Sequence, residues 1–157
     1  MLPVLTAFHT LVSLIGIVAG VVAVLVLARG AYAERWNLIF LVTTILTSAT
    51  GFLFPFVKLL PSHIVGIVSL VVLAMAVLAR YAFKLNGGWR TTYAVTAAIA
   101  LWFNVFVLVA QAFSKISFLK EIAPTQSEPP FAIAQAVMLI VCVALGVRAV
   151  RGKKRAV

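Results

Sequence analysis

The chain has 157 residues, of which 64% are hydrophobic and 10% are charged, and its formal net charge is +10. A soluble fold of this length keeps a large part of its surface in contact with water, so it could not bury so many apolar side chains. The composition therefore excludes an ordinary soluble domain and indicates an integral membrane protein. The length suits a single transmembrane helical domain over residues 1–157, without a second domain.

The apolar residues form five long runs separated by short polar joints, and each run is long enough to cross about 30 Å of hydrocarbon as a helix. We expect an all-α bundle of five transmembrane helices. These cover approximately residues 3–28, 38–56, 62–83, 91–113 and 131–147. The segment 114–130 contains Pro124, Pro129 and Pro130, which predicts a loop. The first run has no preceding Lys or Arg and is too long for a signal-peptide core, so a retained helix is expected.

The basic residues predict the orientation of these helices. Ten of the 13 Lys and Arg residues belong to one end of the expected bundle, namely Arg29, Arg35, Arg80, Lys84, Arg90, Arg148, Arg151, Lys153, Lys154 and Arg155. Cytoplasmic ends carry more Lys and Arg, so the N-terminus is expected outside and the C-terminus inside. The expected location is a bacterial cytoplasmic (inner) membrane, with the basic tail at anionic lipid headgroups. Nucleic acid is not an expected partner, because no aromatic platform accompanies the charge.

Polar side chains gather at the expected outer, periplasmic end of the bundle. They are His9, His63, Gln111, Gln126, Glu128 and Gln135, and Asn104 and the hydroxyl of Thr47 extend the set inward. Polar groups are costly in hydrocarbon and often mark functional sites. We therefore predict a ligand-binding pocket at this end, roofed by the loop 114–130. Each member also has a packing interpretation, such as a helix cap for Glu128 or an interhelical hydrogen bond for Asn104.

Small residues on the first helix indicate close helix packing. Gly16 and Gly20 form a G-x-x-x-G pair, which lets a neighbouring helix approach closely. The hydroxyls of the second helix are expected either to bond their own backbone carbonyls or to line the polar pocket.

Several functions remain open from the sequence. The first is a structural, accessory or ligand-binding membrane protein, which forms a homo-oligomer or binds a partner membrane protein. Another is a redox protein in which His9 and His63 bind haem b, or in which His9, His63 and Glu128 bind a divalent metal ion. A component of a small-solute transporter is a further alternative. An enzyme is less expected, because the chain has no Asp and the apolar runs contain no Glu, which leaves no carboxylate for a catalytic triad or pair.

Overall fold

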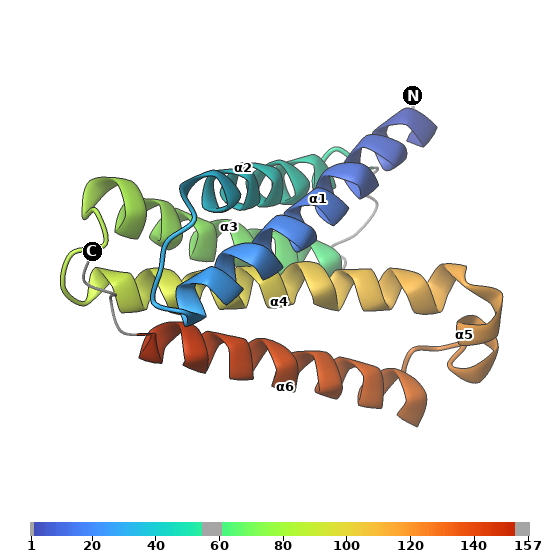
Figure 1. Cartoon of the computed structure of the whole chain (residues 1–157). Helices are drawn as coiled ribbons and strands as arrows, with labels where there is room; N and C mark the ends of the chain where they lie inside the picture. Colours follow the sequence, from blue (N-terminus) through green and yellow to red (C-terminus); the bar gives the residue numbers. More distant parts are fainter. Residues whose placement is uncertain (1, 55–60, 153–157) are drawn as a thin grey trace.

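The computed structural model describes residues 2–54 and 61–152, and for residues 61–63 it describes only the backbone (Figure 1). The described chain is helical, in agreement with the expected all-α class. Its elements are α1 (Leu2–Ala28), α2 (Glu34–Gly51), α3 (Pro61–Val77), the π-helical turn η1 (Leu78–Ala82), α4 (Trp89–Lys115), α5 (Ser117–Ile122) and α6 (Pro129–Arg151). By length and composition, α1, α4, α6 and the stretch Ile64–Ala82 could each cross a membrane.

Helices α1 to α4 surround a common interior, and α6 packs on its outer side and adds Ala149 to the buried cluster. Each of these four helices packs against the next, α4 also packs against α1, and α6 covers the outer sides of α1 and α4 (Figure 1). The end of α1, the start of α2, the turn between η1 and α4, and the end of α6 lie at the left in that view. We call this the basic end, because it holds Arg29, Arg35, Arg80, Lys84, Arg90, Arg148 and Arg151. The N-terminus and α5 lie at the opposite end, called here the N-terminal end.

Helix α2 differs most from its predicted boundaries. It begins at Glu34 and ends at Gly51, whereas residues 38–56 were expected. Hydropathy places the start of a helix at the first residue of an apolar run. In α2 the polar residues before that run are also helical, so the helix begins earlier than predicted. The carboxylate of Glu34 in the first turn is favoured by the helix dipole. Part of the predicted end, residues 55 and 56, lies outside the described residues.

The last helix and the predicted loop also required correction. Helix α6 continues to Arg151 rather than ending near residue 147, and cations in a last helical turn are favoured by the negative end of the dipole. Within the predicted loop, α4 extends to Lys115 and the six-residue helix α5 follows. The rest of the loop is non-helical up to Pro129, where proline opens α6 as expected for a first helical position.

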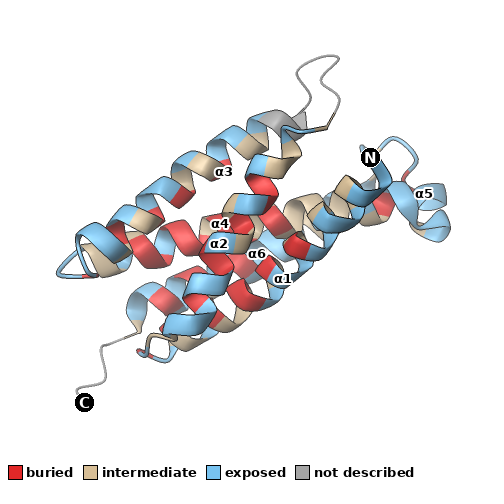
Figure 2. Ribbon diagram, turned by 90° about the horizontal axis from the view of Figure 1, so that it is seen from above, coloured by how far each residue is buried: buried red, intermediate tan, exposed pale blue. Residues whose placement is uncertain are grey.

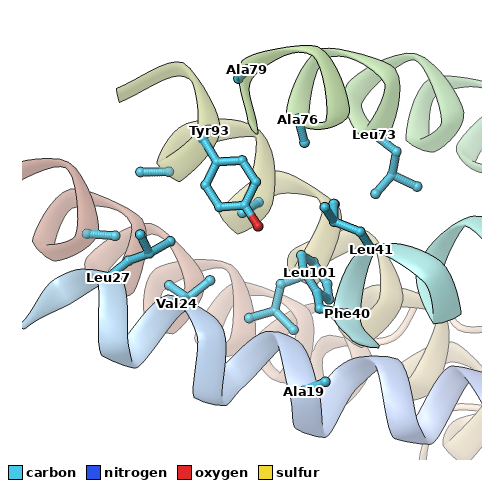
Figure 3. Close-up of a cluster of buried hydrophobic side chains, with 14 of the residues drawn as sticks. Ala19, Val24, Leu27, Phe40, Leu41, Leu73, Ala76, Ala79, Tyr93 and Leu101 are labelled. Atoms are coloured by element: carbon cyan, nitrogen blue, oxygen red, sulfur yellow. The ribbon is translucent and has the colours of Figure 1, made fainter. Parts of the chain in front are cut away.

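The interior between α1 and α4 is filled mainly by small and aliphatic side chains. Figure 3 shows them pointing toward one another from all four helices, with the ring of Tyr93 among them. Close packing at the glycine pair is confirmed: a Cβ atom on Gly20 would lie 2.7 Å from the ring of Phe40 and 3.0 Å from Leu101. Around this interior the outer faces are exposed (Figure 2), and on α6 only Cys142, Gly146 and Ala149 are buried.

The π-helical turn η1 sits where α3 reaches the basic end. The backbone N–H of Phe83 donates to the carbonyl of Leu78, five residues earlier, at 3.0 Å. A turn of this kind holds one residue more than an α-helical turn. It keeps Ala79 in the core while the guanidinium of Arg80 reaches Glu34 on α2.

Candidate functional site

His9 contacts the end of α2. Its Nδ1 lies 2.9 Å from Oγ1 of Thr50, and its ring meets the ring of Phe54 edge to face, with centroids 5.3 Å apart. The Thr50 hydroxyl already donates to the carbonyl of Leu46 at 2.7 Å. The tautomer that satisfies both contacts donates from Nδ1 and leaves the lone pair on Nε2.

Two of the glutamines predicted for the outer pocket are bonded to the backbone of α4. Nε2 of Gln126 donates to the carbonyl of Ala110 at 2.9 Å, and Nε2 of Gln135 donates to that of Phe106 at 3.1 Å. The remaining oxygen of Gln135 is buried without a hydrogen-bond partner in the described protein. Gln111 is exposed on α4, apart from these two contacts. Gln126 and Gln135 thus join the loop and α6 to α4, at carbonyls one helical turn apart.

Glu128 is bonded within its own loop. Its carboxylate accepts hydrogen bonds from the backbone N–H of Thr125, from the Thr125 hydroxyl and from the backbone N–H of Ser127, at 2.8–3.1 Å. Desolvation acts to raise the pKa of Glu128, but these hydrogen bonds outweigh it and hold the pKa below its ordinary value. Glu128 is the residue that precedes α6, yet its side chain caps no N–H of that helix. The predicted helix cap is therefore a loop-closing carboxylate.

The structure describes the side chains of only some of the predicted haem and metal ligands. Among the described residues, no three His, Cys, Asp or Glu side chains group closely enough to hold a metal ion. The side chain of His63 lies outside the described residues, so the distance between the two imidazoles is not part of the structure. His9 itself contacts α2, while the hydrogen bonds of Glu128 stay within the loop before α6. Convergence of His9, His63 and Glu128 remains a prediction.

The hydroxyls of α2 are divided between packing and pairing. Thr43 and Thr50 donate to carbonyls one turn earlier, as the packing interpretation expects. Ser48 donates to Ser69 of α3 at 3.1 Å. The Thr47 hydroxyl is buried and has no hydrogen-bond partner in the described protein.

Asn104 of α4, which was predicted to extend the pocket inward, forms a buried interhelical bond. Its Nδ2 donates to Oγ1 of Thr44 on α2 at 3.1 Å. Gly16 of α1 faces the same pair, since a Cβ atom there would lie 3.3 Å from the Thr44 hydroxyl and 3.6 Å from Nδ2 of Asn104. Three helices therefore meet at this polar contact.

A second polar network, at the basic end, was not predicted. The hydroxyl of Tyr93 on α4 donates to Oδ1 of Asn37 on α2 at 2.5 Å, and Nδ2 of Asn37 donates to the carbonyl of Ala33 at 2.7 Å. Both side chains are fully buried. Asn37 precedes the apolar run of its helix, so hydropathy assigns it to the joint between two helices. The only sequence signal that it belongs to the helix is its place after Ala33 and Glu34, in a polar helix start.

Arg80 joins this network to the surface. Its Nη2 donates to both carboxylate oxygens of Glu34, at 2.5 and 2.6 Å, and its guanidinium lies 4.9 Å from the ring centre of Tyr32. Tyr32, in the joint between α1 and α2, also meets the ring of Tyr93 edge to face. Burial raises the pKa of Tyr32 above its ordinary value, although the neighbouring Arg80 cation opposes this.

Two cavities open between α6 and its neighbours. A groove of about 300 Å³ between α4 and α6 is lined by apolar side chains and by Arg151. A second cavity of about 480 Å³ between α1 and α6 is lined by Arg29, Arg148 and Arg151 at the basic end. Sequence reasoning assigned these arginines to orientation and not to a site, because their convergence depends on how α6 packs against α1.

Comparison with known proteins gives no assignment. No protein-family model, curated protein or solved structure matches this chain. Its function must therefore be argued from its own geometry.

Proposed function

We propose that the chain is a small multipass membrane protein of structural or accessory type. The observation that carries this proposal is the pairing of four of the polar residues expected to line a pocket. Asn104, Gln126 and Gln135 each donate to another segment of the bundle, and Glu128 closes its own loop. Interhelical hydrogen bonds of this kind hold membrane helices together, and they use one N–H of each of these amides.

The proposed orientation has the basic end in the cytoplasm and the N-terminal end outside, in a bacterial inner membrane. The seven basic residues gathered at one end of the described bundle support it, since cytoplasmic ends carry the excess of Lys and Arg. In this orientation α2 is a fifth crossing. Its buried Asn37 is tolerable at the membrane boundary because the Tyr93 hydroxyl pairs with it.

Cysteine labelling tests this orientation. In a Cys142→Ser background, Gln126→Cys should react with a membrane-impermeant maleimide in intact cells, and Lys84→Cys should react only after lysis. Both positions are exposed or half-exposed, so access differs only through the membrane. The reverse pattern would overturn the orientation.

A haem or metal protein is the second candidate, favoured by one observation at His9. Donation from Nδ1 to Thr50 fixes the ring and leaves the lone pair on Nε2, which is how protein histidines are prepared as ligands. His63 would supply the second ligand.

The absorption spectrum and metal content of the purified protein separate the two candidates. The structural proposal expects neither a Soret band nor a stoichiometric metal. The second candidate would replace the structural proposal if the protein holds one equivalent of haem or metal. His9→Ala should then abolish binding of that haem or metal, and Thr50→Ala should weaken its binding. The Thr50 variant matters because it removes only the group that orients the imidazole.

A further inference from the structure

The two cavities beside α6 meet at one arginine. Arg151 and Val147 line both the apolar groove between α4 and α6 and the basic cavity between α1 and α6. An apolar channel thus leads to a site that Arg29 and Arg148 complete. This combination matches a molecule with a hydrocarbon chain and an anionic head.

Among the described residues, no carboxylate pairs with the arginines of the basic cavity. The chain contains three acidic residues, Glu34, Glu121 and Glu128. Glu34 pairs with Arg80, and the other two lie in or after α5 at the N-terminal end (Figure 1). In the described protein Arg29, Arg148 and Arg151 form no ion pair. An anion from another molecule could therefore supply their counter-charge.

The dimensions of the groove agree with a lipid chain. From Leu139 to Arg151 the groove follows α6 for about 18 Å by helical rise, close to one leaflet of a hydrocarbon core about 30 Å thick. Its wall includes Ala98 of α4 and Gly146 of α6, where the two helices touch: a Cβ atom on Gly146 would lie 2.9 Å from that of Ala98. All three arginines are exposed at helix ends, where the phosphate layer of the membrane lies.

We propose that α1, α4 and α6 form a binding site for an anionic phospholipid, with one acyl chain in the groove and the phosphate at Arg29, Arg148 and Arg151. Guanidinium groups bind phosphate oxygens through paired N–H donors, which suits this task better than lysine. The site goes beyond the structural role proposed above and does not depend on it. It also needs no assumption about orientation, since it can be tested in detergent.

The test titrates the purified full chain, in an uncharged detergent, with phosphatidylglycerol or with phosphatidylcholine of the same acyl chains. Binding is followed by native mass spectrometry. We expect phosphatidylglycerol to bind at least tenfold more tightly, with one molecule retained per chain. Equal retention of the two lipids would overturn the proposal.

Two pairs of matched variants locate the site. Arg29→Gln with Arg148→Gln should reduce the affinity for phosphatidylglycerol about tenfold or more, whereas Arg35→Gln with Lys84→Gln, of the same net charge, should leave it unchanged. Val143→Trp fills the groove and should weaken binding, whereas Ile140→Trp, on the same helix outside the groove, should not. Equal losses in the two charge variants would mean general electrostatic attraction, and equal losses in the two tryptophan variants would mean that the groove holds no acyl chain. Either result contradicts the site.

Two further outcomes would name a different occupant. If glycerol phosphate competes as strongly as the lipid, the arginines bind phosphate alone and the groove has no part. If lipid-free protein is a dimer that Val143→Trp dissociates, a second copy of the chain occupies the groove. Either result would overturn the lipid proposal.

Discussion

The two faces of α4 are both covered by helices but are packed in different ways. Toward α1, α2 and α3 it presents Tyr93, Leu101 and Asn104, which are buried, and both polar side chains bond to α2. Toward α6 it presents Ile99 and Trp102, which line the open groove. Helices in lipid gain little from hydrophobic association, so dense packing and hydrogen bonds decide which interfaces close. The interface with α6 closes at Gly146, which lies against Ala98, and at the hydrogen bond of Gln135, but the groove beside Ile99 and Trp102 stays open and leaves room for a lipid chain.

The largest expected effect is a difference in stability loss between the two faces of α4 when an aliphatic side chain of similar size is truncated on each. Leu101→Ala should cost about 2 kcal/mol of stability, the lower end of the range for soluble cores, because the removed atoms return to lipid and not to water. Ile99→Ala, on the groove side, should cost less than half as much. Reversible unfolding in mixed detergent and denaturing surfactant measures both. Equal losses would mean that the groove is as tightly packed as the interior.

A smaller effect is expected from the buried hydroxyl on the inner face. Tyr93→Phe keeps the ring but leaves Oδ1 of Asn37 buried without its donor, which should cost about 1–2 kcal/mol. Tyr81→Phe is the control, since Tyr81 is exposed at the same end. The same unfolding assay applies, and a neutral Tyr93→Phe would show that water satisfies Asn37.

The smallest effect concerns the polar contact between α4 and α2. A double-mutant cycle of Asn104→Ala and Thr44→Val should give a coupling of about 0.6 kcal/mol, the average for hydrogen bonds between membrane helices. Asn104→Ala with Ser69→Ala should show no coupling, because Ser69 pairs with Ser48. A coupling above about 2 kcal/mol would place Asn104 in a larger polar site than packing requires.

The helices could be predicted because a bilayer demands long apolar segments, and α1 and α4 begin and end within about two residues of expectation. The start of α2 could not, because Glu34 and Asn37 are made acceptable by Arg80 and Tyr93, which come from distant parts of the chain. Hydropathy describes a residue by its own solvation. It contains no information on a partner supplied by another helix.

The candidate sites show the same limit. Depth along a helix placed His9 and Gln135 toward one end, but depth does not determine rotation about the helix axis. The observed partners, Thr50 for His9 and the α4 backbone for Gln135, depend on that rotation. The scarcity of acidic residues was visible in the sequence. Together with the number of arginines, this scarcity indicates that some of the basic side chains have no carboxylate partner within the chain. The sequence does not indicate which basic side chains these are.

The π-helical turn η1 has the geometry of a helix that has absorbed one extra residue. Each residue of an α-helix advances by about 100°, and the wider turn over Leu78–Ala82 takes up one such step, so removing one residue would restore an α-helical turn there and change the directions in which Ala79 and Arg80 point. Ala79 and Arg80 could then no longer serve the core and Glu34 together. The length of this segment, more than its composition, therefore determines whether the ion pair at the basic end can form.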